Sequence, residues 1–175
     1  MSKVINRTLM LVEAQNVIGW FNEFSKNKIN ELPVKVQWNI LSGIKKLRPV
    51  VADFEEFRNK LIQDIQTEYF GEEKSEEFDR EQLDEKGEPV LDADGNHVME
   101  KARKVKDEFI DEYQNRINEV NKEINDLLME KTTYSFNGID LDTVVDGLAD
   151  DASINLDDIN FISFIDINSA DIESD

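Results

Sequence analysis

The stretch from Leu32 to Phe70 constrains the fold most, because its apolar residues recur at helical spacing over an unusual length. Steps of three, four or seven residues place one set on a single helix face: Ile40, Ile44, Leu47, Val51, Phe54, Leu61, Ile65 and Tyr69. At ~1.5 Å per residue this helix would span roughly 55 Å, more than a small globular domain needs. Pro33 suits its first turn. Pro49 predicts a kink beginning near Lys45, with two helices meeting there as the alternative.

A second amphipathic stretch, roughly Glu100 to Lys131, is the expected partner of the first. Its apolar residues also recur every three or four positions: Val105, Phe109, Tyr113, Ile117, Val120, Ile124 and Leu127. Two such helices joined by one connection should pack antiparallel, because neither is stable until its apolar face is buried. The sequence therefore predicts a mainly α fold led by a long antiparallel helical hairpin.

Smaller elements are expected before and within this hairpin. Residues 2–7 are compatible with a short strand, and an N-terminal helix is expected from about Thr8 to Lys26. Two turn signals, Asp84 to Gly87 and Asp92 to Gly95, interrupt the connection. They predict a small inserted β-hairpin, at about residues 84–99, that turns at Asp94-Gly95.

The chain changes character after Lys131. Thr132 to Phe136 and Ile154 to Leu156 are expected as minor β pieces, with a short helix at about residues 139–148 between them. The last residues, 168–175, are predicted to be a flexible tail. We therefore expect a helical hairpin domain over residues 1–131 and an acidic C-terminal extension over residues 132–175.

The net charge of -19 is unevenly placed along the chain. Residues 132–175 contain eleven acidic and no basic side chains, and residues 71–100 contain twelve acidic and three basic ones. The two long helices are near neutral. Direct nucleic-acid binding needs clustered lysine and arginine, so this layout argues against it.

Several other classes are also disfavoured. No run approaches the ~20 apolar residues of a membrane span, so no membrane association is expected. Residues 1–6 carry no apolar signal core, which indicates a cytoplasmic protein. The absence of cysteine excludes disulfides, thiolate metal sites and cysteine nucleophiles.

The sequence shows no pattern typical of a catalytic, metal or cofactor site. Placing Gly95 at the sixth position of an EF-hand loop puts Val90 at position one and Lys101 at position twelve, so the calcium pattern fails. His97 is the only histidine and is expected to be an exposed turn residue. Carboxylate pairs are too numerous for any one pair to indicate catalysis. The sequence therefore predicts no enzyme activity, no metal and no cofactor.

The candidate functional residues are sites of protein contact. Trp20 and Trp38 lie on apolar helix faces, which favours core packing and leaves partner anchoring as the alternative. Two groups complete the interaction candidates: the basic patch Lys45, Lys46 and Arg48, and the apolar cluster Phe161, Ile162, Phe164 and Ile165. We expect that cluster to dock on the basic patch of a neighbouring subunit; the alternative is that it folds back on its own hairpin. A second basic group could also receive a neighbour's acidic tail: Lys101, Arg103, Lys104 and Lys106.

The order of these signals resembles a family of small acidic proteins encoded by tailed bacteriophages and prophages, with no assigned activity. The resemblance covers most of the chain and rests on the following segments: the N-terminal helix, Leu32-Pro33-Val34-Lys35-Val36, Ile40, Ile44 to Leu47, Phe54 to Ile62, the turns at 84–87 and 92–95, Glu123 to Leu128, and Leu156 to Ile159 before Phe161-Ile162. This chain is longer at residues 71–83 and after Phe164. The resemblance implies phage origin, but no chemistry and no functional residues.

Two non-enzymatic functions are therefore expected from the sequence. The first is a structural protein of the virion, such as a ring, connector or phage tail-associated subunit, which forms a closed homo-oligomer with protein partners in a phage assembly. The second is a phage accessory protein that inhibits a host defence by acidic nucleic-acid mimicry. Either would be made in the host cytoplasm during infection.

Overall fold

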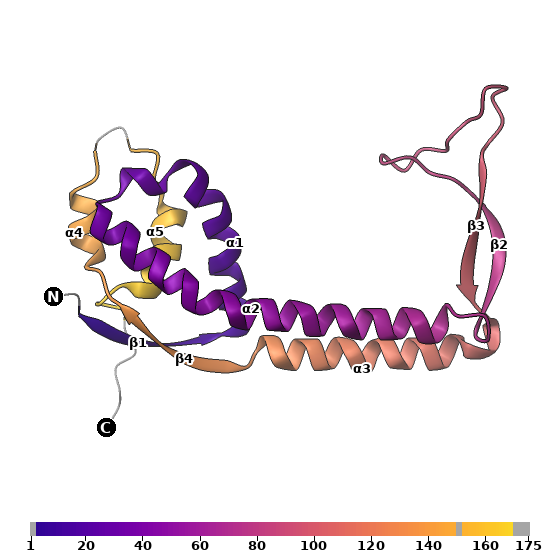
Figure 1. Cartoon of the computed structure of the whole chain (residues 1–175), viewed down its shortest axis with the longest axis horizontal. Helices are drawn as coiled ribbons and strands as arrows, with labels where there is room; N and C mark the ends of the chain where they lie inside the picture. Colours follow the sequence, from indigo (N-terminus) through magenta and orange to yellow (C-terminus); the bar gives the residue numbers. More distant parts are fainter. Residues whose placement is uncertain (1–2, 150–151, 170–175) are drawn as a thin grey trace. The chain divides into compact units, whose positions relative to one another are not determined.

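A computed structural model describes residues 3–149 and 152–169 of the chain (Figure 1). The protein is mainly helical, as predicted, with two small two-stranded antiparallel sheets. It divides into two compact units: residues 1–56 with 125–175 form unit 1, and residues 57–124 form unit 2. The predicted boundary at residues 131/132 does not coincide with this division, because the segment after it pairs with the N-terminal strand.

Unit 1 is framed by strands from opposite ends of the chain. β1 (Val4–Met10) pairs antiparallel with β4 (Lys131–Asn137). The strand expected at 132–136 is confirmed within β4. The strand that residues 2–7 allow begins at Val4 and runs to Met10, so the helix expected from about Thr8 begins three residues later, at Leu11. α1 (Leu11–Asn27) follows β1 directly, and the Glu13 carboxylate caps its start by accepting the Met10 backbone N–H at 2.7 Å.

The core of unit 1 joins α1, the first part of α2 (Val34–Tyr69) and the C-terminal elements. Its helical part is built from Phe21 and Phe24 of α1 and from Ile40, Ile44 and Leu47 of α2. α4 (Leu141–Asp146), α5 (Leu156–Ile162) and a 3₁₀ turn (Ser163–Ile165) close it. Each fully buried aromatic or aliphatic side chain contributes about 1.5–3 kcal/mol, so the C-terminal segment is an integral part of this core.

Unit 2 pairs helical segments and carries the second sheet. Residues 57–69 of α2 run antiparallel to α3 (Ile110–Leu128) within this unit, and Ile65, Tyr69 and Val120 are buried between them (Figure 1). β2 (Ser75–Glu81) pairs antiparallel with β3 (Met99–Val105), and a 3₁₀ turn (Asp107–Phe109) leads into α3. Only four residues of this unit form its buried cluster, so its core is small.

The long helix was predicted closely. α2 begins at Val34, immediately after Pro33, and ends at Tyr69, within two residues of the expected bounds. The helix continues through Pro49, so the alternative of two separate helices is wrong. Proline removes one backbone hydrogen bond, and the buried stripe on both sides of it outweighs that loss.

The predicted partner helix and inserted β-hairpin need correction. Residues 99–105 form β3 and not the start of a helix, so α3 begins ten residues later than expected, at Ile110. The real strands are β2, which lies before the predicted 84–99 hairpin, and β3, which shares only Met99 with it. Between the two strands, isolated bridges join Leu83 to Pro89 and Leu91 to His97.

Both turns that were read from the sequence are present. The Asp84 carboxylate accepts the backbone N–H groups of Lys86 and Glu88, and Asp92 accepts those of Asp94 and Asn96, all at 2.8–2.9 Å. Gly87 and Gly95 close the turns at φ of 81° and 83°, a left-handed conformation that favours glycine.

The C-terminal expectations are partly confirmed. The short helix expected near 139–148 is α4. The strand expected at Ile154 to Leu156 is wrong, because Asn155 caps α5 through its side chain and Leu156 is already helical. Most of the expected tail, residues 170–175, lies outside the described residues.

Candidate interaction surfaces

Trp20 lies inside unit 1, as core packing predicts. Its ring stacks on Phe24 at a centroid distance of 4.5 Å and on Phe161 at 5.5 Å. Its indole N–H donates a 2.9 Å hydrogen bond to Oδ1 of Asp158. This tryptophan therefore joins α1 to α5 and is not free to anchor a partner.

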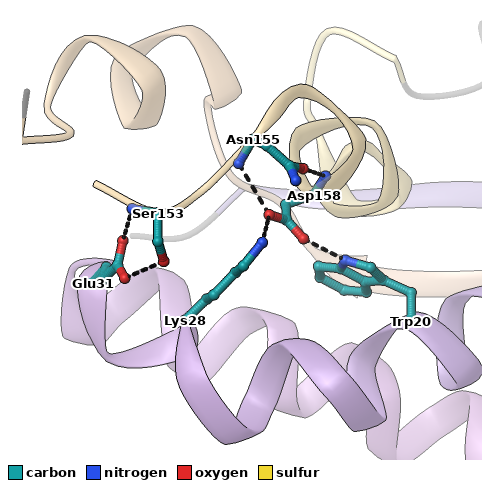
Figure 2. Close-up of polar contacts among 6 residues, drawn as sticks. All are labelled: Trp20, Lys28, Glu31, Ser153, Asn155 and Asp158. Atoms are coloured by element: carbon teal, nitrogen blue, oxygen red, sulfur yellow. Dashed lines mark hydrogen bonds and ion pairs between the residues drawn. The ribbon is translucent and has the colours of Figure 1, made fainter. Parts of the chain in front are cut away.

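A polar cluster beside Trp20 fixes the C-terminal segment to the N-terminal one (Figure 2). The buried Asp158 carboxylate also accepts hydrogen bonds from Nζ of Lys28 at 2.7 Å and from the backbone N–H of Asn155 at 3.0 Å. Burial raises the pKa of Asp158, but these hydrogen bonds outweigh it and hold the pKa below its ordinary value. The cluster thus holds a charged carboxylate.

Glu31 makes a second contact of this kind. Its carboxylate accepts the backbone N–H of Ser153 at 2.7 Å and the Ser153 hydroxyl (Figure 2). These two hydrogen bonds lower the pKa of Glu31. Asp158 and Glu31 are the polar residues that sequence reasoning missed, because in an acidic chain no single carboxylate is distinctive before the fold brings its donors close.

Trp38 does not pack in the core, so the favoured prediction for it is wrong. The side of α2 that carries Val36, Ile40 and Ile44 is buried, and Trp38 lies off that side with 68% of its surface exposed. Val34 and Leu41, spaced by four and three residues from Trp38, are also exposed, at 81% and 44%. These three residues form one apolar stripe, which we call the α2 stripe.

The predicted basic patch continues this stripe. Lys45 and Arg48 are exposed, and they follow Leu41 at steps of four and three along the same helix. Lys46 points elsewhere, because its Nζ donates to the backbone carbonyl of Ser135 in β4. The structure therefore separates Lys46 from the two cations beside the α2 stripe.

Three members of the second basic group lie on β3 and face acidic residues of β2, whereas the fourth, Lys106, donates to the backbone carbonyl of Glu73. Lys104 pairs with Glu76 at 2.8 Å, Arg103 with Glu77 at 3.2 Å, and Lys101 with Asp79 at 2.7 Å. In a fourth pair the cation lies on β2 and the carboxylate on β3: Arg80 contacts Glu100 at 2.6 Å. We call these four pairs the hairpin ion ladder. Since the β3 cations are used within the chain, they are poorly placed to receive a neighbour's tail.

The predicted tail cluster is buried within its own chain. Ile162, Phe164 and Ile165 are at most 4% exposed, and Phe161 is partly buried against Trp20. The expectation that this cluster docks on a neighbouring subunit is wrong, and folding back is what occurs. The reason is that α4 and α5 bring the segment onto α1 and α2, where apolar partners are already present.

Unit 2 carries an open apolar groove between its two helical segments. Its volume is about 310 Å³. Nine side chains line it, none of them charged: Ile62, Ile65, Gln66, Phe70, Tyr113, Ile117, Val120, Asn121 and Ile124. Two packed helices bury only the apolar sides that face each other, so the apolar side chains that line this groove remain open to solvent.

Several ionisable groups of unit 2 form ion pairs. Nζ of Lys74 contacts Glu112 at 2.6 Å and Glu68 at 3.1 Å, and these hydrogen bonds raise the pKa of Lys74. Burial, followed by the hydrogen bond to Glu112, raises the pKa of Tyr69. His97 lies half exposed beside Glu81 at 2.7 Å, as expected for a turn residue.

Within residues 3–149 and 152–169, no group of three or more His, Cys, Asp or Glu is placed to hold a metal ion. None of the helices in this described part is long and apolar enough to cross a membrane. No family model, no curated protein and no solved structure matches this chain. The exposed α2 stripe and the uncharged groove of unit 2 are therefore the candidate interaction surfaces.

Proposed function

We propose that this protein is a non-enzymatic subunit of a bacteriophage particle, a ring, connector or tail-associated component that acts through protein contacts in a closed homo-oligomer. The observation that carries the proposal is the α2 stripe. Tryptophan is enriched among the residues that dominate binding energy at protein interfaces. The exposed Trp38 side chain would gain free energy on burial against a partner.

The charges around the stripe indicate what kind of partner suits it. Lys45 and Arg48 extend it with two exposed cations. An apolar surface bordered by acidic residues would complement this arrangement. The chain itself is strongly acidic, so a neighbouring subunit offers such a surface, and closed symmetry is the usual arrangement of identical subunits.

The sequence resemblance alone supports a phage origin. A phage origin in turn makes the virion the proposed assembly. Mass spectrometry of purified particles, combined with light scattering of the isolated protein, tests the proposal. We expect the chain to be present in particles and the isolated protein to be larger than a monomer. A protein that is monomeric at high concentration and absent from particles would refute the proposal.

The Trp38→Ala variant tests the part played by the α2 stripe. We expect it to weaken assembly, since the loss of an interface tryptophan costs about 2 kcal/mol or more. Met129→Ala is a matched control, because Met129 is exposed to a similar extent, 61%, but lies away from the stripe. Equal assembly of both variants would exclude the stripe as the contact.

Nucleic-acid mimicry is the second candidate, and the net charge of -19 favours it. A mimic needs an ordered array of free carboxylates that repeats the spacing of phosphates. The hairpin ion ladder argues against such an array on β2, because Glu76, Glu77 and Asp79 are each paired with a cation. Absence of the protein from particles would favour this candidate.

A further inference from the structure

We propose that the groove of unit 2 is a self-association surface, which binds the same groove of a second copy of this chain. This inference rests on the proposed function as an assembly subunit, and it names which surface joins two copies. It concerns unit 2 alone and is separate from the α2 stripe of unit 1.

The first observation is the absence of charge on the groove side of α3. Seven of the nineteen residues of α3 are charged. The residues of α3 that line the groove are instead uncharged: Tyr113, Ile117, Val120, Asn121 and Ile124. Depletion of charge at the centre of a surface is the compositional mark of an interface.

The same pattern holds across the groove on α2. Residues 57–69 include four charged side chains, yet those that line the groove are Ile62, Ile65 and Gln66. Ile62 is 43% exposed although it borders the buried Ile65. Both helices therefore present isoleucine and amide side chains to the same opening.

The second observation identifies the occupant as another copy. Repulsion between two copies of a chain of net charge -19 is smallest at a face without charged side chains, so the uncharged groove is a surface on which two copies can approach closely. Asn and Gln amides both donate and accept hydrogen bonds, so Gln66 and Asn121 can pair with the same residues across a two-fold axis. Two helix pairs packed groove to groove form a four-helix arrangement, which buries the isoleucines that one pair leaves open.

The size of the surface sets the expected affinity. Each segment is roughly 20 Å long, and two adjacent helices are about 20 Å wide, which gives a face of about 400 Å². Stable complexes bury about 800 Å² per partner. We therefore expect a reversible dimer through this groove, which other contacts of the assembly reinforce.

Site-specific crosslinking tests the interface directly, because the natural chain contains no cysteine. In the full-length Asn121→Cys variant, a short bis-maleimide crosslinker should yield a covalent dimer. Asn115→Cys is the matched control: it is also an exposed asparagine on α3, but helical spacing places it on the side away from the groove. Dimer from Asn121→Cys alone supports the proposal, whereas equal yields or no dimer from Asn121→Cys overturn it.

A charge variant provides the second measurement. Asn121→Lys places two like charges across the axis and should weaken self-association at least about tenfold, while Asn115→Lys should leave it unchanged. Circular dichroism and thermal melting establish that both variants are folded. Oligomers in light scattering that Asn121→Lys does not weaken would overturn the groove interface and leave the assembly function standing. That function fails separately, by absence of the chain from particles.

Discussion

Asp158 shows how much a single buried residue contributes to unit 1, since it accepts hydrogen bonds from Trp20, Lys28 and Asn155. Asp158→Asn keeps the shape and removes the charge that Lys28 faces. We expect a loss of about 1.5–3 kcal/mol in the free energy of unfolding, measured by urea denaturation. Asp157→Asn, at the exposed neighbouring position, should change stability by no more than ~0.5 kcal/mol. Equal losses in the two variants would contradict this role of Asp158.

The same carboxylate gives unit 1 a pH dependence. The pKa of Asp158 in the folded protein lies below the ordinary value of 3.8, so the unfolded chain binds this proton more readily. The stability that Asp158 contributes is therefore present above about pH 3.8 and is lost as the pH falls through the folded-state pKa. We expect the difference in free energy of unfolding between wild type and Asp158→Asn, measured by denaturation from pH 7 to pH 3, to stay constant and to shrink only at the acid end of this range. A difference that disappears near neutrality would rule this out.

At the scale of the element, two glycines in helices should respond to alanine in opposite ways. A Cβ at Gly43 of α2 would lie 2.9 Å from the ring of Phe164, which is buried, whereas a Cβ at Gly19 of α1 meets nothing within 4 Å. Gly19→Ala should stabilise by about 0.5–1 kcal/mol, through helix propensity. Gly43→Ala should destabilise by about 1–3 kcal/mol, because the core must shift. Thermal melting measures the direction of both stability changes. Stabilisation by Gly43→Ala would show that the close approach between position 43 and the Phe164 ring is not present.

The β2–β3 pair should depend on salt more than the β1–β4 pair does. The hairpin ion ladder holds four exposed ion pairs across β2 and β3, and such pairs are screened by added salt. We expect amide hydrogen exchange in β2 and β3 to accelerate on raising sodium chloride from about 0.05 M to about 1 M, a range over which the screening length falls several-fold. β1 and β4 serve as the internal control, and equal acceleration in both sheets would exclude the ladder as the cause.

The elements also show how far local patterns extend. The apolar period of α2 was sufficient to place it within two residues, because every turn of that helix repeats the same signal. The segment before Ile110 was read as helix because Val105 and Phe109 continue the period backwards, yet residues 99–105 are β3. What decides that strand is pairing with residues 75–81, and such pairing depends on residues distant in the sequence. Helical spacing identifies an apolar face of α2 but does not show whether another element packs on it. The exposure of Trp38 therefore could not be predicted from the sequence.

At the scale of the whole molecule, the two units differ in how much core supports them. Among residues 3–149 and 152–169, the buried cluster of unit 1 contains eighteen residues drawn from both ends of the chain, and that of unit 2 contains four. The helical segments of unit 2 could be predicted from the sequence but the division into units could not, because no local pattern shows that residues 125–149 and 152–169 pack in the core of unit 1. Local opening is easiest where few apolar contacts are buried. Unit 2 is therefore expected to be the less stable part of an isolated chain.

This difference makes self-association measurable through stability. A second copy that binds the groove of folded unit 2 stabilises that unit by mass action, and the effect grows once the protein concentration exceeds the dissociation constant. We expect amide exchange in residues 57–69 and 110–124 to slow as protein concentration rises, while exchange in α1 of unit 1 stays unchanged. In Asn121→Lys, unit 2 should lose this concentration dependence, and in Asn115→Lys it should keep it. Exchange in unit 2 that is independent of concentration in the natural chain would mean that its small core is completed by some other contact.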